Sequence, residues 1–209
     1  MKIELQKLLP KDIEARSFEI ITQELGERQL PSDRADVIKR VIHTTADFDY
    51  VDQLVFSPHA VEQARAALSS GVDIITDTQM AKAGINKTRM ASFGGQVHCF
   101  MSDPDVAQMA KERGTTRATI SMEKAAALGG HPIFAIGNAP TALIRLYEMI
   151  VEGSIAPSLV IGVPVGFVNV VEAKELILQT QVPYIVARGR KGGSNVAAAI
   201  CNALLYGIK

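Results

Sequence analysis

The sequence carries no excess of either charge and no long hydrophobic run. Its 22 lysines and arginines balance 22 aspartates and glutamates, which gives a formal net charge of +0. Because no overall field would draw such a chain to nucleic acid or to an anionic membrane, neither is expected as a partner. The longest apolar stretch, residues 159–171, is broken by Pro164 and Asn169, which excludes a membrane-spanning helix there. The chain begins MKIE, with Glu4 where a signal peptide builds its apolar run, so we expect a cytoplasmic protein.

Cysteine is scarce, and no set of metal ligands stands out. Cys99 and Cys201 lie outside any CxxC or Cys/His pattern, so we expect free thiols that are neither zinc ligands nor nucleophiles. Four aspartates could suggest an acid/base pair or a magnesium site, but carboxylates near strand ends more often cap helices or pair with arginines; they are Asp47, Asp49, Asp73 and Asp77. Three histidines share no spacing with His43 and are interpreted as structural; they are His59, His98 and His131.

No linker rich in Pro, Gly or Ser divides the chain, and there is no internal repeat. We therefore expect residues 1–209 to form a single domain. Short β-rich runs alternate with helical segments; the runs are residues 52–56, 72–76, 96–101, 132–136, 159–163 and 183–187. This alternation predicts the α/β class, with one three-layer domain built on a mostly parallel, doubly wound sheet that has helices on both faces.

Capping residues mark the expected helices. Pro58 and Pro104 stand in the first turns of two segments, a position that proline tolerates, and Gly26, Gly71 and Gly114 follow helical segments as stops. The expected helices cover residues 11–25, 59–68, 104–113, 117–128 and 142–151, together with a C-terminal helix.

Nucleotide-binding fingerprints are missing. No GxGxxG string follows the first strand, so hydride transfer has no support. The string GRKGGS, residues 189–194, lacks the spacing of GxxxxGK[ST]. It is equally consistent with a basic glycine loop for a carboxylate or phosphate and with a solvated turn. A nucleotide-binding α/β domain would be stabilised against heat by nucleotide, which gives a simple test of that alternative.

The most informative stretch is RVIHTTADFDY, residues 40–50. The preceding residues 31–33, PSD, form a helix start signal, and an apolar stripe at helical spacing brings His43 to the last turn. Arg40 lies three residues earlier on the same face, so both side chains could contact one anionic ligand. Histidine is the side chain that most readily exchanges a proton near neutral pH. A structural histidine remains an alternative on these residues alone.

Three loops are expected at the carboxyl ends of parallel strands, where doubly wound sheets bind ligands. They are residues 136–141, 162–166 and 188–194. Their glycines allow close approach of a ligand, and helix N-termini attract anions. The last loop adds three basic side chains, those of Arg188, Arg190 and Lys191.

Six strings together resemble the precorrin-8X methylmutase family, which includes cobalt-precorrin-8 methylmutases. They occur in the expected order from residue 13 toward the C-terminus and so cover nearly the whole chain. The strings are IEARSF (13–18), RVIHTTADFDY (40–50), ITDTQM (75–80), IGNAPT (136–141), GVPVGFV (162–168) and GRKGGS (189–194).

The resemblance implies an isomerase of corrin biosynthesis. It moves a methyl group from C11 to C12 of precorrin-8X or cobalt-precorrin-8, giving hydrogenobyrinate or cobyrinate, without a cofactor. It further implies a homodimer, His43 as the catalytic acid, and a substrate-binding set comprising Ser17, Arg40, Arg117, Asn138, Arg190 and Lys191. The alternative is a non-catalytic corrinoid carrier, which would bind the product stoichiometrically and change no bond.

Overall fold

The computed structural model describes residue 9 and residues 12–208, so the expectations for residues 1–4 and for Lys11 lie outside the described residues. Six strands form one sheet in the order β1-β6-β5-β4-β2-β3. Every neighbouring pair is parallel except β1 and β6, which run antiparallel. The strands are β1 (Leu54–Phe56), β2 (Ile74–Thr76), β3 (Val97–His98), β4 (Ile133–Ile136), β5 (Leu159–Gly162) and β6 (Tyr184–Ala187). The mostly parallel sheet predicted from the sequence is confirmed.

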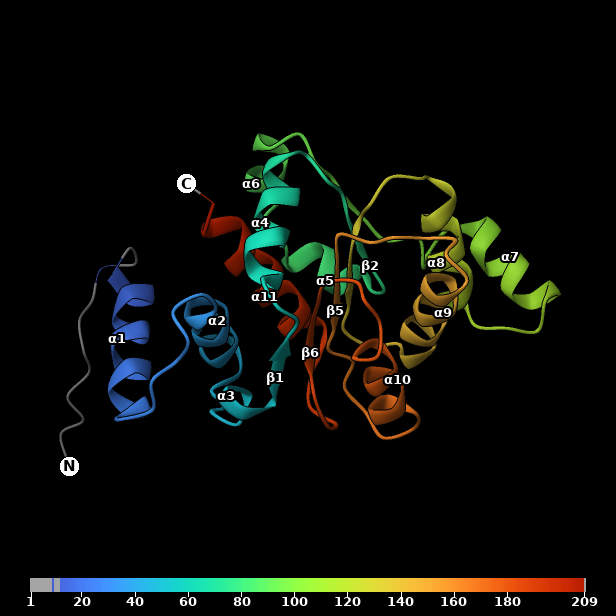
Figure 1. Ribbon diagram of the computed structural model, residues 1–209. Coiled ribbons are helices and arrows are strands. Elements are labelled where there is room, and N and C mark those ends of the chain that lie inside the picture. The colour runs from blue at the N-terminus through green and yellow to red at the C-terminus, as the bar shows by residue number, and fades with distance from the viewer. Residues whose placement is uncertain (1–8, 10–11, 209) are drawn as a thin grey trace, which may run out of the picture.

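Helices lie on both faces of this sheet, as predicted. One buried core joins the sheet to α1 (Ile13–Leu25), α2 (Ala35–Thr45), α3 (Tyr50–Gln53), α4 (Ala60–Ser69), α5 (Gln79–Gly84), α6 (Lys87–Ser92) and α11 (Ser194–Tyr206). A second core joins the opposite face to α8 (Arg117–Ala127), α9 (Pro140–Val151) and α10 (Val170–Ile177). The remaining helix, α7 (Pro104–Glu112), packs against α8 at one end of the molecule, and α1 packs beside α2 at the other (Figure 1).

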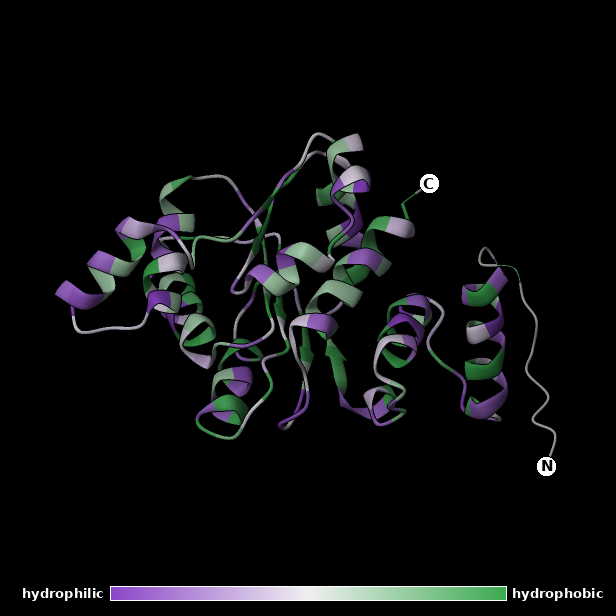
Figure 2. Cartoon of the chain, turned by 180° about the vertical axis from the view of Figure 1, so that it is seen from behind, coloured by the Kyte–Doolittle hydropathy of each residue, from purple (hydrophilic) through white to green (hydrophobic). Residues whose placement is uncertain are grey.

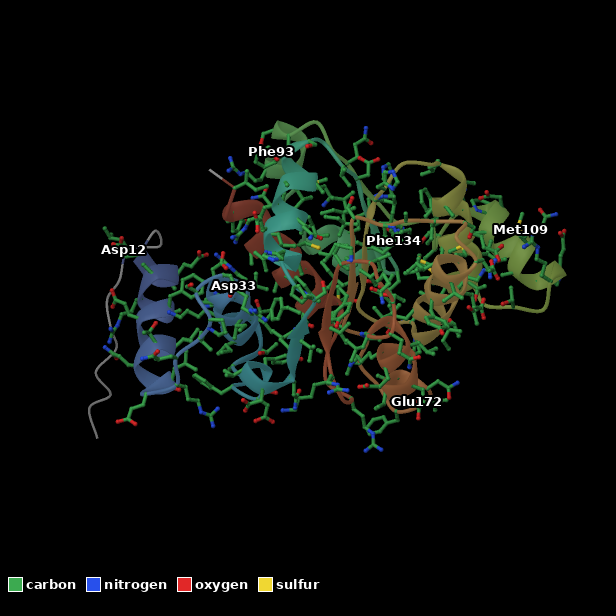
Figure 3. The ribbon with its side chains drawn as sticks, in the orientation of Figure 1. Asp12, Asp33, Phe93, Met109, Phe134 and Glu172 are labelled. Atoms are coloured by element: carbon green, nitrogen blue, oxygen red, sulfur yellow. The ribbon has the colours of Figure 1, made fainter. Side chains whose placement is uncertain are left out.

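The two central strands, β4 and β5, are the ones that the sequence predicts most clearly. All four residues of β4 and of β5 are buried, because a parallel sheet covered on both faces needs continuous apolar strands. Figure 2 shows these hydrophobic strands between helices with one hydrophobic and one hydrophilic side. Figure 3 places Phe134 of β4 in this interior, whereas Glu172 of α10 and Met109 of α7 lie toward the periphery. The edge strand β3 has only two residues, fewer than predicted.

Helix α2 has the amphipathic form that the sequence indicates. Its apolar stripe is buried, with exposed fractions of 0 to 2%, at Val37, Ile38, Val41 and Ile42. Burying a side chain of this size contributes about 1.5–3 kcal/mol. The helix ends where Ala46 takes a left-handed conformation (φ 53°) and donates its N–H to the carbonyl of Ile42. His43 therefore lies in the last turn, as predicted, with its side chain on the exposed side.

Candidate active site

Loops that follow four parallel strands meet at the carboxyl edge of the sheet. The amide of Gly193, after β6, donates to the carbonyl of Val163, after β5, at 2.8 Å. Gly137, after β4, lies so close to the same segment that a Cβ placed on it would be 2.7 Å from Cα of Ser194. The hydroxyl of Thr78, after β2, lies 2.8 Å from the hydroxyl of Ser194. These contacts bring the predicted loops together around one edge, which is the usual ligand-binding edge of such sheets.

His43 and Ser17 line one cavity between α1 and α2. The cavity has a volume of about 220 Å³, and Phe48 and Ala46 complete its mouth on the side of the loop that follows α2. The imidazole packs against the ring of Phe18, with ring centroids 5.4 Å apart. Within the described part of the chain it makes no hydrogen bond. Its nitrogens are therefore available to a ligand.

Arg40 is already paired inside the protein. Its guanidinium donates to Glu14 at 2.8 Å and lies over the rings of Phe18 (4.9 Å) and Tyr206 (5.1 Å). The hydrogen bond from Arg40 lowers the pKa of Glu14, and the charges of Arg40 and His43 add to this effect. Because Arg40 is engaged by Glu14, a ligand that uses it together with His43 must share or displace that carboxylate.

Lys191 joins the loop after β6 to the loop after α2. Its ammonium donates to Asp47 and to Asp49, both at 2.6 Å. These two hydrogen bonds raise the pKa of Lys191 far above its usual range, and the same contact lowers the pKa of Asp47. The pairing places Lys191 next to the segment that leaves the His43 helix. The sequence predicted that these carboxylates cap helices or pair with arginines; both pair with a lysine instead, and Asp47 also accepts the backbone N–H of Asp49 at 3.0 Å.

Arg190 contacts a different loop from Lys191, the one that follows β5. Its side chain is exposed, and its guanidinium lies 5.5 Å from the ring centroid of Phe167. The loop around that ring is apolar yet open to solvent, with exposed fractions of 48% at Val165, 81% at Phe167 and 78% at Val168. A cation therefore borders an exposed apolar surface, an arrangement suited to a flat ligand with an anionic rim.

Asn138 is held by a buried carboxylate. Asp77, which is fully buried, accepts the backbone N–H groups of Gly137 (2.9 Å), Asn138 (2.8 Å) and Ala139 (2.6 Å). Burial raises the pKa of Asp77, and the three N–H donors oppose that rise. The amides that lead into α9 are thus occupied by Asp77, so the expectation that they bind a substrate anion is wrong. The exposed Asn138 side chain remains free to reach a ligand.

Arg117 begins α8, on the other face of the sheet from α2 (Figure 1). The hydroxyl of Thr116 caps this helix at the amide of Thr119 and lies 3.0 Å from the hydroxyl of Thr141, at the start of α9. Arg117 is exposed and pairs with no acidic side chain in the described residues. No contact in that part of the chain links it to His43, so one ligand would have to be large to reach both.

Residues outside this edge have structural partners. His98 lies 2.9 Å from Asp73, the exposed His59 lies 3.3 Å from Glu62, and His131 contacts the carbonyl of Ala156. Both cysteines are free and buried, as expected for free thiols. In the described residues, no cluster of three or more metal-ligating side chains occurs. No helix there is long and apolar enough to cross a bilayer.

Comparison with known proteins supplies the family. Residues 12–207 match the model of the precorrin-8X methylmutase family. The chain is 48% identical to the cobalt-precorrin-8 methylmutase of Salmonella typhimurium, over 96% of both chains. It is 46% identical to that of Priestia megaterium, over 93% of this chain and 87% of the relative. A crystal structure of precorrin-8x methyl mutase from Thermus thermophilus aligns with a TM-score of 0.85 at 39% identity, covering 93% of this chain and 96% of that one. The chain belongs to the precorrin-8X methylmutase family.

Proposed function

We propose that this methylmutase moves a methyl group from C11 to C12 of precorrin-8X or of its cobalt counterpart. Membership of the family over residues 12–207 supports an isomerase of corrin biosynthesis. The exposed imidazole of His43, which lines one cavity with Ser17, is the structural observation that carries the assignment of the site. The rearrangement changes the bonds within a single molecule, so it balances without an oxidant, a reductant or a transferred group. Cobalt, where present, belongs to the substrate.

His43 acts as the acid in this proposal. It donates a hydrogen bond or a proton to the macrocycle near ring C as the methyl group migrates, and it recovers that proton when the product forms. Such a contact accelerates the reaction because it is stronger in the migrating state than in the substrate. Ser17 lies in the same cavity and contacts the substrate beside the imidazole.

The carboxylates of the substrate are bound by the basic side chains of the edge. Arg117 and Arg190 are exposed, and the exposed side chain of Asn138 adds an amide. Lys191 and Arg40 are pre-positioned by Asp47, Asp49 and Glu14. Charge-assisted contacts of this kind are worth roughly 1.5–3 kcal/mol each. The apolar plane of the ring rests on the exposed loop of Val165, Phe167 and Val168.

Turnover tests the proposal directly. Catalytic amounts of protein are incubated with excess precorrin-8X and with its cobalt form, and the formation of hydrogenobyrinate or cobyrinate is followed. Many product equivalents per protein support the methylmutase. Stoichiometric binding without a change in connectivity would support the corrinoid carrier instead. Nucleotides serve as a third comparison, since a nucleotide-binding domain would show a rise in melting temperature.

We also infer that residues 1–209 form one domain, that the protein is cytoplasmic, and that it is a two-fold homodimer. Support for the dimer comes from the family resemblance and from the hydrophobic content of 47% in a chain this short. Two-fold dimers are also the commonest closed assembly. Sedimentation at micromolar concentration should give twice the chain mass of 22.5 kDa. A mass equal to one chain would contradict the dimer, and recovery in the membrane fraction would contradict the location.

A further inference from the structure

A lysine outside the substrate-binding set lies directly behind the basic loop. Lys174 of α10 is fully buried, with 0% of its surface exposed. Its ammonium donates to the carbonyl of Gly189 and to the carbonyl of Lys191, both at 2.8 Å. No carboxylate pairs with it in the described residues. Burial lowers the pKa of Lys174 to about 8. Burying an ammonium that has only backbone carbonyls as acceptors costs free energy of folding. We therefore ask what its contacts with the loop contribute.

Those contacts fix the loop in one conformation. The carbonyls of Gly189 and Lys191 are bound by Lys174, and the carbonyl between them, that of Arg190, accepts the amide of Gly166 at 3.1 Å. Three consecutive carbonyls are thus held from the protein side. At the next residue, a Cβ on Gly192 would collide with the carbonyl of Val163. The backbone of residues 189–193 is therefore packed tightly between α10 and the loop after β5.

This conformation determines where two substrate-binding side chains point. With the backbone held from one side, Arg190 extends over Phe167, and Lys191 reaches Asp47 and Asp49 in the loop after α2. A shift of the carbonyls of Gly189 and Lys191 would move both cations, and it would loosen the link to the helix that carries His43. Such a shift would weaken binding of the substrate's carboxylates, since each charge-assisted contact depends on its geometry.

We propose that Lys174 is a positioning residue, which holds the loop of residues 189–193 so that Arg190 and Lys191 meet the carboxylates of the substrate. The inference rests on the proposed function for the identity of the ligand. Lys174 itself is too deeply buried to touch the substrate, so it acts through the two side chains that it positions.

Lys174→Met tests this, because methionine nearly matches the length of lysine and donates no hydrogen bond. We expect KM for the tetrapyrrole substrate to rise about tenfold or more while kcat changes less than about threefold, since the loop binds rather than reacts. Lys111→Met, on the exposed side of α7, is the matched control and should leave both constants unchanged. A double variant, Lys174→Met with Lys191→Met, should lose less affinity than the sum of the two single losses, because residues that act through one another are not additive.

A second measurement does not depend on activity. Amide hydrogen exchange at Gly166 and Gly193 should accelerate about tenfold or more in Lys174→Met, while β4 and β5 stay protected, since loss of the ammonium frees the loop locally. If Lys174→Met does not fold, Lys174→Leu, which also donates no hydrogen bond, is held to the same criteria.

An unchanged KM in a folded variant, or unchanged exchange at both glycines, would overturn the inference. Failure of the wild-type protein to convert the substrate would instead overturn the proposed function. In that case the exchange result would still decide whether Lys174 holds the loop.

Discussion

The imidazole of His43 packs against the phenyl ring of Phe18, with ring centroids 5.4 Å apart and planes tilted by 45°. The same ring contacts the guanidinium of Arg40 at 4.9 Å. One aromatic side chain from α1 therefore positions two side chains of α2. Because His43 is oriented by packing rather than by an internal hydrogen bond, both of its ring nitrogens can face a substrate. An imidazole held in this way is better suited to catalysis than to a structural role.

His43→Ala should lower kcat by about 100-fold or more, the lower end of the range for positioned acid–base groups. Because the side chain is exposed, the variant should fold and should bind hydrogenobyrinate with near-normal affinity. Steady-state turnover measures kcat, circular dichroism measures folding, and calorimetric titration measures the affinity for hydrogenobyrinate. His131→Ala serves as the control, since its ring contacts the carbonyl of Ala156 outside the site. A His43→Ala variant with normal kcat would end the catalytic assignment.

His43→Asn distinguishes two possible roles of His43, donation of a hydrogen bond and transfer of a proton. The amide of asparagine donates a hydrogen bond but cannot transfer a proton. Retained activity in His43→Asn, with loss in His43→Ala, would show that hydrogen bonding is sufficient. Loss in both folded variants would indicate proton transfer, whereas failure of both to fold would restore the structural interpretation.

Arg117→Ala should weaken product binding about tenfold or more, since one charge-assisted contact is worth roughly 1.5–3 kcal/mol and 1.4 kcal/mol is a factor of ten. Calorimetric titration with hydrogenobyrinate at low salt measures the change. Arg28→Ala is the matched control, because Arg28 forms an exposed ion pair with Asp52 and does not belong to the substrate-binding set. Equal affinity in Arg117→Ala and the wild type would remove Arg117 from the binding set.

The sequence was most informative where one local pattern determines the structure. The strands β4 and β5 are runs of apolar residues buried on both faces, and α2 has an unbroken apolar stripe, so both were predicted to within a few residues. Once those strands are assigned, the positions of the loops after β4, β5 and β6 can be predicted as well. Contacts such as that of Gly193 with Val163 show that these loops meet at the carboxyl edge, whereas the binding role of their residues stays a prediction.

Contacts between distant segments could not be predicted in the same way. Arg40 meets Glu14 across two helices, and Lys174 looks like any lysine of an amphipathic helix, yet it is fully buried beneath a loop 15 residues later. The short helices α5 and α6 were missed because their starts depend on side-chain caps at Thr78 and Asn86 rather than on a long apolar period. The sequence marks Asp77 only as a carboxylate near a strand end, because its three amide partners lie 60 to 62 residues away.

Asp77→Ala should destabilise the fold by about 3 kcal/mol or more, because three N–H groups lose their acceptor in a buried place and each costs roughly 1–3 kcal/mol. Asp77→Asn keeps one carbonyl acceptor and should cost less. Urea unfolding measures both changes. Asp105→Ala is the control, since its ion pair with Lys124 is on the surface and such pairs are worth about 0–1 kcal/mol. Equal stability of Asp77→Ala and Asp105→Ala would refute the capping role.

Burial of Lys174 should make stability depend on pH above neutrality. Burial lowers the pKa of this lysine from 10.5 to about 8 in the folded protein. Below pH 8 the lysine is protonated in both the folded and the unfolded states, so its contribution to the free energy of unfolding does not change with pH. That contribution includes the full cost of burying the charge. Between about pH 8 and 10.5 the unfolded chain binds a proton that the folded protein does not. The free energy of unfolding therefore rises with pH in this window, by at most about 1.4 kcal/mol per unit.

The test compares the wild type with Lys174→Met, because other titrating groups cancel in the difference between the two proteins. Their free energies of unfolding in urea are measured from pH 7 to pH 10. Wild type minus variant should be flat up to about pH 8 and should then increase, toward a total of roughly 3 kcal/mol if the window is completed. Leu176→Met, in the same helix, changes no ionisable group, so its difference from the wild type should stay constant. A Lys174→Met difference that is equally constant would mean that the folded lysine keeps its proton throughout, held by the carbonyls of Gly189 and Lys191.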